Sequence, residues 1–168
     1  IVRYSNVYGP GQRRENPNCG VAAKFTAAAL AGAAPLVLGD GTQSRDFTYI
    51  DDLVQGIRLL LDAIPQQGPD KDVQAPQSEV DSQSPVAPFR VVNIGNSQAV
   101  QLTDFIAAIE EATGRDAIRN LMPMQAGDVP ATWADASLIR DLTGYTPSTP
   151  IAQGVRNFVA WYRDYYRL

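Results

Sequence analysis

Apolar side chains recur every three or four residues in several stretches of the chain, which is the spacing of one face of an α-helix. The clearest stretch follows Asp51, where six apolar residues form one stripe: Leu53, Val54, Ile57, Leu60, Leu61 and Ile64. Four other stretches have the same spacing or matching boundary residues. Five helices are therefore expected, over residues 17–32, 51–64, 102–115, 134–145 and 150–166.

Residues that favour helix ends stand at these boundaries. Aspartate and threonine can cap free backbone N–H groups, proline fits the first turn, and glycine accepts the left-handed backbone that ends many helices. We therefore expect helices to begin at Asp51, Thr103, Asp135 and Thr149–Pro150, and to end at Gly32, Gly114 and Gly144.

Three shorter apolar runs predict strands, at residues 1–7, 35–41 and 89–96. Strands that alternate with helices indicate the α/β class. Three strands are too few for a complete doubly wound sheet, and no G-x-G-x-x-G turn joins a strand to a helix. The pattern alone therefore predicts part of an α/β protein that lacks the usual dinucleotide-binding turn.

Residues 65–88 differ in character from the rest of the chain. The segment is rich in proline, glutamine, serine and aspartate and contains no aromatic residue. Such a composition buries too little apolar surface to offset the entropy of ordering. Because core-like elements resume on both sides, the sequence predicts a mobile surface insertion here.

The composition narrows the possible chemistry. The chain has 168 residues, 45% of them hydrophobic, and a formal net charge of −4, which does not suit a nucleic-acid-binding surface. It has no histidine and one cysteine, which excludes a Ser-His-Asp triad, a Cys-His pair, a His-ligated zinc site and a disulfide framework. The sequence shows neither a signal peptide nor an apolar run of about 18 residues. A cytoplasmic setting without membrane contact is expected.

Five stretches in order resemble one family: "RYSNVYGPGQ", "RDFTYIDDLVQGI", "VVNIGN", "GDVPATWADAS" and "GVRNFVAWYRDYY". Together they look like the C-terminal half of the NAD-dependent nucleotide-sugar epimerases and dehydratases, which belong to the extended short-chain dehydrogenase/reductase family. The closest resemblance is to UDP-glucuronate and UDP-glucose 4-epimerases. The fold that the resemblance implies is an incomplete Rossmann sheet with a small mixed α/β substrate-binding domain.

The family's two hallmarks of catalysis are missing from the sequence. The resemblance implies a glycine-rich turn for NAD and a catalytic Tyr-x-x-x-Lys pair, both N-terminal to the segment matched here. Lys24 follows Gly20 by four residues and Lys71 follows Gln67, so no Tyr-x-x-x-Lys pair exists. We therefore expect residues 1–168 to be the C-terminal substrate-binding region of a larger enzyme, inactive alone.

Arg45 stands in "RDFTYIDDL", before a predicted helix whose N-terminus would favour anions. An arginine fork suits a pyrophosphate, and the resemblance implies a phosphate contact for Arg45. Asp51 and Asp52 would then serve the helix. The alternative for Arg45 is a surface ion pair with an aspartate, which contributes little.

The resemblance implies further contacts to the nucleotide. Asp128 would accept the ribose hydroxyls, although it could instead fix its loop as an Asx-turn residue. Leu36 and Leu38 would pair with the uracil through their main chains. Asn18 would touch the phosphates, or else cap the first helix. Gln125 stands where many UDP-galactose epimerases have arginine, which removes one phosphate contact.

Three positions near the start of the chain would face the reacting sugar. Asn6 matches a hexose contact of 4-epimerases, although several glucuronate epimerases carry threonine there. Ser5 would lie against the nicotinamide of NAD. Arg13 could hold a sugar carboxylate, or be an exposed loop arginine. The aromatic run near the C-terminus is expected to be core and amphipathic surface, not a stacking platform.

The resemblance implies a UDP-hexose or UDP-glucuronate as the bound partner, NAD as the cofactor and a homodimeric parent enzyme. Alternatives on the same scaffold are a nucleotide-sugar dehydratase, decarboxylase or reductase. A third reading is a nucleotide-sugar-binding module without chemistry of its own.

Overall fold

The computed structural model describes residues 1–4, 6–17, 19–34, 36–65, 83–84, 88–123 and 129–168. Within these ranges lie five helices: α1 (Val21–Ala31), α2 (Ile50–Leu60), α3 (Leu102–Thr113), α4 (Ser137–Thr143) and α5 (Ile151–Tyr166). Eight strands accompany them: β1 (Val2–Tyr4), β2 (Asn6–Tyr8), β3 (Leu36–Leu38), β4 (Ser44–Tyr49), β5 (Val92–Ile94), β6 (Ala99–Gln101), β7 (Asn120–Met122) and β8 (Ala131–Thr132). Most of the predicted insertion at 65–88 lies outside the described residues, so its mobility stays a prediction.

The helix ends agree well with the sequence. Gly32, Gly114 and Gly144 each follow the last helical residue with a left-handed backbone, at φ of 66°, 67° and 70°. In each case the glycine N–H donates back to a carbonyl of the preceding turn. All three predicted stops are confirmed, because a left-handed residue at a helix end is a local requirement that glycine meets without strain.

The helix starts agree less well. Helix α2 begins at Ile50 after an extended Tyr49, so Asp51 is a first-turn residue and not the cap. Helix α3 begins at Leu102, which places Thr103 inside the helix. Asp135 comes closest to its predicted role, because its Oδ1 accepts the N–H of Ser137, the first residue of α4, at 2.9 Å.

The last helix also begins one residue later than predicted. Pro150 is the extended residue before α5, and Ile151 is the first helical residue. The N–H of Thr149 donates to Asp52 Oδ2 at 2.8 Å, so this threonine is bonded to α2. The predicted cap at Thr149 is therefore wrong, because Pro150 is the residue directly before the helix and the Thr149 N–H bonds to Asp52 instead.

The strands depart furthest from the sequence-based prediction. The stretch at 1–7 forms two short strands, β1 and β2, and four further strands were not predicted: β4, β6, β7 and β8. Strand β4 is the most consequential, because it covers residues 44–49, which had been assigned to the approach of a helix. The fold class is confirmed as mixed α/β.

The strands form three small sheets. β1 pairs in parallel with β5. β4 pairs in parallel with β2 and β8 and antiparallel with β6. β3 pairs in parallel with β7. The short stretch that contains β1 and β2 thus contributes to two different sheets.

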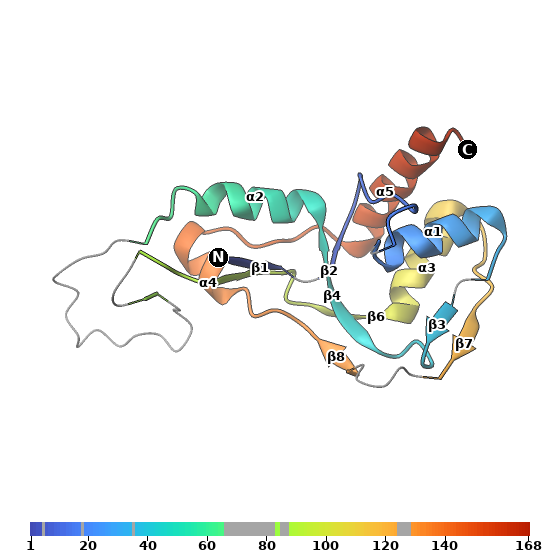
Figure 1. The fold of residues 1–168 in the computed structure, drawn as a ribbon, viewed down its shortest axis with the longest axis horizontal. Coiled ribbons are helices and arrows are strands. Elements are labelled where there is room, and N and C mark those ends of the chain that lie inside the picture. Colours follow the sequence, from blue (N-terminus) through green and yellow to red (C-terminus); the bar gives the residue numbers. More distant parts are fainter. Residues whose placement is uncertain (5, 18, 35, 66–82, 85–87, 124–128) are drawn as a thin grey trace.

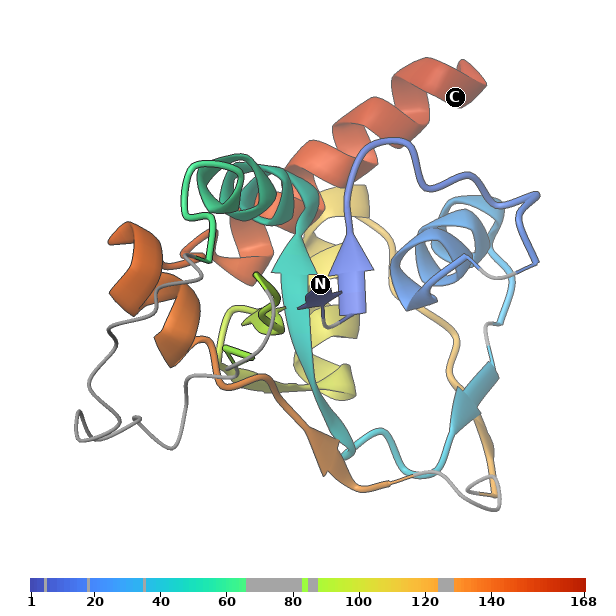
Figure 2. The same cartoon turned by 60° about the vertical axis from the view of Figure 1, so that its left-hand side comes forward.

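The described residues form two apolar cores, and the helices that enclose them lie toward the two ends of the molecule (Figure 1). One end holds α2 and α4 against β1 and β5, with Leu53, Ile94 and Ile139 buried between them. The other end gathers α1, α3 and α5, where Phe105 and Phe158 are fully buried. Figure 2 shows β4 running between these ends, with α5 projecting beyond the body of the molecule.

Candidate nucleotide-sugar site

Arg45 lies near the start of β4, flanked by two other strands. Its register partners are Val100 on β6 and Thr132 on β8. Its Nη1 donates to the carbonyl of Ser44 at 2.8 Å. Helix α2 starts at Ile50, and an extended strand advances by about 3.3 Å per residue, which puts Arg45 roughly 15 Å from the helix start. The expectation that Arg45 stands at the N-terminus of this helix is therefore wrong. The positive end of the α2 dipole is too far away to help Arg45 bind an anion.

Asn6 lies on the strand next to Arg45. In the parallel register of β2 and β4, Asn6 pairs with Phe47, which is two residues further along β4 than Arg45. The Asn6 side chain is exposed. The structure therefore brings two of the predicted substrate contacts onto adjacent strands, although 39 positions separate them in the chain.

The strand predicted to pair with a base is present, with one open edge. β3 pairs residue by residue with β7, from Leu36 opposite Asn120 to Leu38 opposite Met122. The N–H of Gly39 extends the pairing by donating to the Met122 carbonyl at 2.8 Å. Among the described residues β7 is the only partner of β3. Its other edge carries the main-chain donors and acceptors that base recognition would need.

Next to Arg45, a buried carboxylate ties three segments together. Asp46 is fully buried, and its two oxygens accept three backbone N–H groups. These come from Asn96 at 2.9 Å, Ser97 at 3.0 Å and Ala134 at 3.1 Å. Hydrogen bonds from backbone N–H groups to a carboxylate are among the stronger ones in proteins. This junction fixes β4 to the turn after β5 and to the segment after β8.

The backbone around the junction is adapted to the carboxylate. A Cβ on Gly95 would come within 2.5 Å of Asp46 Oδ2 and 2.6 Å of the Ala134 Cβ, so only glycine fits there. Ser97 has a left-handed backbone at φ 56°, which is uncommon for a residue other than glycine. Its hydroxyl donates to the Ala134 carbonyl at 3.0 Å. The one sign of this junction in the sequence is that an aspartate, Asp46, directly precedes the mostly apolar stretch "FTYI".

Asp52 has a structural role, as expected. Its Oδ1 accepts the hydroxyl of Tyr145 at 2.8 Å and its Oδ2 accepts the Thr149 N–H, which joins α2 to the segment between α4 and α5. Partial burial, together with the bond to this carboxylate, raises the pKa of Tyr145 well above its ordinary value. Asp51 is exposed in the first turn of α2.

Arg13 lies in the loop that follows β2. It lines a hollow of about 820 Å³ between the loop that follows β2 and the end of α5, together with Glu15, Tyr165 and Tyr166. The Tyr166 hydroxyl donates to Glu15 Oε2 at 2.7 Å, which anchors this loop to the helix. None of the other predicted contacts lines the hollow among the described residues. A role for Arg13 in holding a sugar carboxylate stays a prediction.

Three predicted contacts lie outside the described residues: Ser5, Asn18 and Asp128. Gln125 lies outside them as well. Their roles stay predictions. The aromatic residues near the C-terminus behave as expected, since Tyr162 is fully buried in the core and Tyr165 is half exposed on the helix surface.

The described residues do not fit a complete NAD site. No glycine-rich turn leads from one of their strands directly into a helix, and the sequence has no Tyr-x-x-x-Lys pair for acid–base chemistry. In the same residues, no three histidine, cysteine, aspartate or glutamate side chains gather as a metal site. None of their helices combines the length and apolar character needed to cross a bilayer.

Comparisons with known proteins agree with this geometry. Residues 1–75 match the model of the NAD dependent epimerase/dehydratase family. The chain is 44% identical over 98% of its length to a probable UDP-glucuronate 4-epimerase from Rhizobium meliloti (strain 1021), of which it covers 46%. It thus spans about half the length of the curated relatives it matches.

Two solved structures are similar over nearly the whole chain. UDP-glucose 4-epimerase from Thermotoga maritima, solved with UDP-glucose, matches 99% of this chain with a TM-score of 0.78 at 26% identity, over 46% of that structure. UDP-glucuronic acid 4-epimerase from Bacillus cereus, solved with UDP-glucuronic acid and NAD, matches 99% with a TM-score of 0.75 at 28% identity, over 45% of that structure.

The architecture is that of the epimerases of the short-chain dehydrogenase/reductase type, of whose structures it reproduces roughly half. Its sequence and its fold lead to the same group. Residues 1–75 match the NAD-dependent epimerase/dehydratase family, and UDP-sugar 4-epimerases are among the proteins to which nearly the whole chain is similar.

Proposed function

We propose that this chain is the nucleotide-sugar-binding half of an NAD-dependent UDP-sugar 4-epimerase, of the UDP-glucuronate or UDP-glucose type. The observation that carries the proposal is the placement of Arg45 and Asn6 on adjacent strands, in a fold shared with UDP-sugar 4-epimerases. In this assignment Arg45 contacts the pyrophosphate and Asn6 faces the sugar. The open edge of β3 receives the uracil.

The binding of the nucleotide would serve the chemistry by positioning. Contacts to the UDP end are remote from the reacting carbon, and such binding energy supports catalysis when it holds the sugar in the reactive orientation. NAD supplies hydride exchange at the sugar when bound. This chain's own residues would orient the substrate, and the NAD would be held mainly by the part of the relatives' length that this chain does not match.

Calorimetry with UDP tests the proposal directly. The Arg45→Ala variant should bind UDP more weakly by about 1.5–3 kcal/mol, or roughly tenfold to a hundredfold, because it loses a charge-assisted bond to phosphate. Arg140→Ala is the matched control, since Arg140 is an exposed arginine paired with Asp141 on α4. It should bind UDP as the unaltered chain does. Equal affinity of the Arg45 variant and the unaltered chain would overturn the assignment.

A second measurement concerns the chemistry. The pure chain, incubated with UDP-glucuronate or UDP-glucose and NAD, should yield no 4-epimer above the blank, because it lacks the tyrosine–lysine pair. Turnover by the pure chain would contradict its assignment as a binding half.

A further inference from the structure

Ser97 has a backbone conformation that few residues other than glycine adopt. Its φ is 56°, and among the described residues the only other non-glycine residue with a positive φ is Arg167, at the end of α5. This conformation is strained for a residue with a Cβ, and it persists only where the surrounding structure holds it in place. A helix end explains the conformation of Arg167. Ser97 lies between two strands, β5 and β6, so its conformation needs another explanation.

The hydrogen bonds of Ser97 provide that explanation. Its hydroxyl donates to the Ala134 carbonyl at 3.0 Å and accepts the N–H of Ala136 at 3.3 Å. Its own N–H donates to Asp46 Oδ2 at 3.0 Å, and the Ala134 N–H donates to the same oxygen at 3.1 Å. One serine thus joins the segment after β5 to the segment after β8.

The two joined segments adjoin the strands on either side of Arg45. Strand β6 begins two residues after Ser97, and β8 ends two residues before Ala134. In the sheet, Val100 on β6 and Thr132 on β8 are the register partners of Arg45. The Ser97 hydroxyl therefore links the two neighbours of β4 close to the level of Arg45.

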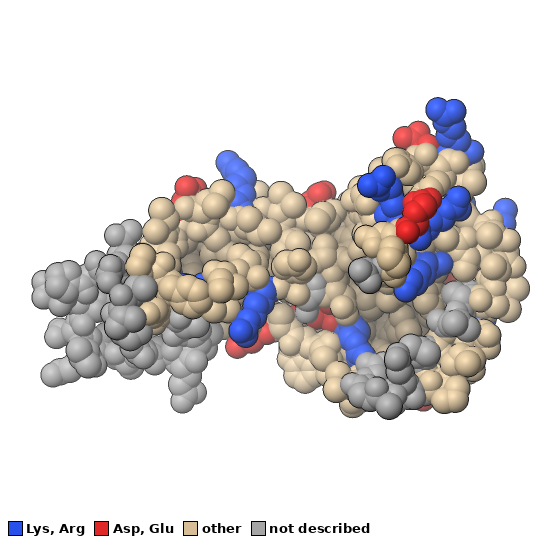
Figure 3. All heavy atoms as spheres, in the orientation of Figure 1, with Lys and Arg blue, Asp and Glu red and all other residues tan. Residues whose placement is uncertain are grey.

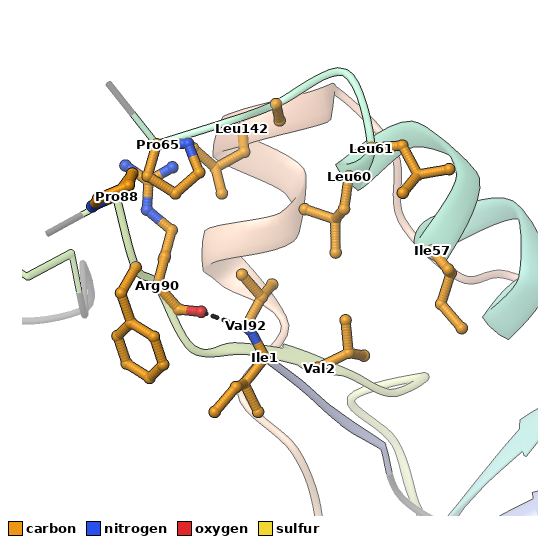
Figure 4. A pocket seen from close by; sticks show the side chains of 12 residues that line it. Ile1, Val2, Ile57, Leu60, Leu61, Pro65, Pro88, Arg90, Val92 and Leu142 are labelled. Atoms are coloured by element: carbon orange, nitrogen blue, oxygen red, sulfur yellow. Dashed lines mark hydrogen bonds between the residues drawn. The ribbon is translucent and has the colours of Figure 1, made fainter. Parts of the chain in front are cut away.

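The strand before Ser97 is itself anchored at both ends. β5 pairs with β1 over its full length, and Figure 4 shows the start of this pair, where the Ile1 nitrogen donates to the Arg90 carbonyl at 2.8 Å. Beyond the other end, the Asn96 N–H donates to Asp46 Oδ1 at 2.9 Å. The turn that carries Ser97 therefore starts from a fixed position, which its hydroxyl passes on to the segment after β8.

We infer that Ser97 is a positioning residue for Arg45. By holding β6 and β8 at a set distance, it determines where the guanidinium lies that contacts the pyrophosphate. This inference rests on the proposed function, and it adds a residue that acts through Arg45 without touching the nucleotide. Glycine would adopt the same φ without strain, so the stability of the turn alone does not call for a serine.

The Ser97→Gly variant separates positioning from stability. It removes the hydroxyl and its two bonds, but it also relieves the backbone strain, so the melting temperature should change by only a few degrees. The affinity for UDP should fall about threefold to tenfold, because Arg45 is no longer held in place before binding. Calorimetry with UDP and thermal unfolding of the same protein measure the two effects.

Ser97→Thr is the opposite variant. It keeps the hydroxyl, but a β-branched residue is strongly disfavoured at a positive φ. The melting temperature should therefore fall, while the affinity for UDP should stay close to that of the unaltered chain. If affinity followed melting temperature in both variants, Ser97 would have a structural role only and the inference would be overturned.

A double variant tests whether Ser97 acts through Arg45. In the Arg45→Ala background, Ser97→Gly should reduce the affinity for UDP no further, because the side chain that it positions is absent. An equal additional loss in that background would overturn the inference.

Thr143→Ala is the matched control. The Thr143 hydroxyl also makes one bond of each kind: it donates to the Ile139 carbonyl at 2.6 Å and accepts the Tyr145 N–H at 3.2 Å. Thr143 is the last residue of α4, which packs with α2 around one of the two cores. On the face shown in Figure 3, basic side chains are fewer over α2 than toward α5. This variant should bind UDP as the unaltered chain does.

The proposed function and this inference fail in different ways. Equal UDP binding by Arg45→Ala and the unaltered chain would overturn the proposed function, and the positioning role with it. Weak binding by Arg45→Ala together with normal binding by Ser97→Gly would overturn the positioning role alone. Weak binding by Ser97→Gly at a nearly unchanged melting temperature, with normal binding by Ser97→Thr and Thr143→Ala, would support the inference.

Discussion

The Asp46 carboxylate accepts the backbone N–H of Ser97 at 3.0 Å, across 51 positions of the chain. Two more N–H groups converge on the same side chain, from Asn96 and Ala134. A single buried acid thus joins β4 to two segments that are distant in sequence. Because Arg45 is the neighbouring residue on β4, the junction also determines where this arginine lies.

Asp46→Ala should destabilise the chain by at least about 2 kcal/mol, because three N–H groups, one buried and two partly buried, lose their carboxylate acceptor at once. Chemical denaturation monitored by circular dichroism measures the loss. Asp46→Asn should be intermediate, since one amide oxygen can still accept. Asp141→Ala, at an exposed ion pair on α4, is the control and should change stability by less than about 1 kcal/mol. A small effect at Asp46 would contradict the junction.

Gly95→Ala should also destabilise the fold, for a steric reason. The added methyl group would stand 2.5 Å from Asp46 Oδ2 and 2.6 Å from the Ala134 Cβ, so the junction would have to open. A loss of about 1–3 kcal/mol is expected for such overpacking. Gly20→Ala is the control, because its Cβ would meet nothing closer than the Gln12 side chain at 3.4 Å. Equal melting temperatures of the Gly95→Ala and Gly20→Ala variants would contradict the steric role of Gly95 in the junction.

Tyr145→Phe should cost about 1–2 kcal/mol at neutral pH, because Asp52 loses one of its two bonds. The substitution should also alter the response to alkali. Partial burial raises the pKa of Tyr145 above its ordinary value of 10, so the folded state keeps this proton more firmly than the unfolded state. Its stabilisation is complete below pH 10 and is lost as the pH rises above that value.

The measurement is the free energy of unfolding at several pH values between 8 and 11. The unaltered chain should lose stability more steeply above pH 10 than the Tyr145→Phe variant. Tyr8 is expected to keep part of this slope in both proteins, because burial raises its pKa as well. Parallel curves for the two proteins would contradict the contribution of Tyr145.

Residues 66–82 should be dispensable for folding. Their composition predicts an insertion without a core, and the cost of closing a loop changes slowly with its length. Replacing them with a short glycine–serine link, while keeping Gln83 and its bond to Arg90, should shift the melting temperature by only a few degrees. A collapse of folding would show that the segment is packed against the body of the protein.

The features that the sequence predicted correctly depend on local chemistry. Gly32, Gly114 and Gly144 end their helices because a left-handed residue is needed within one turn, and neighbouring residues suffice to show it. Strand β4 was missed because an arginine and an aspartate interrupt its apolar pattern. Asp46 becomes intelligible only with its partner Ala134, which lies 88 positions away.

The candidate site was also predicted only in part. The family resemblance indicated Arg45 as a phosphate contact, but the prediction that it lies beside a helix start was wrong. The residues between Arg45 and Ile50 form an extended strand, which separates the two. The proximity of Asn6 depends on the register between β2 and β4, which no periodicity in the sequence specifies. The resemblance therefore indicated which residues to consider as substrate contacts. The sequence did not show how the strands that carry them are arranged.

Strands β1 and β2 lie close together in the chain but belong to different sheets, which couples the positions of the two sheets. β1 is bonded to β5 and β2 to β4. Tyr4 and Asn6 are two positions apart in the chain, and covalent geometry limits the distance between their Cα atoms to about 7 Å. The two sheets therefore cannot move far apart at this point. A shift of β1 along β5 would therefore also move Asn6 on β2, and with it the sugar contact that we propose for Asn6.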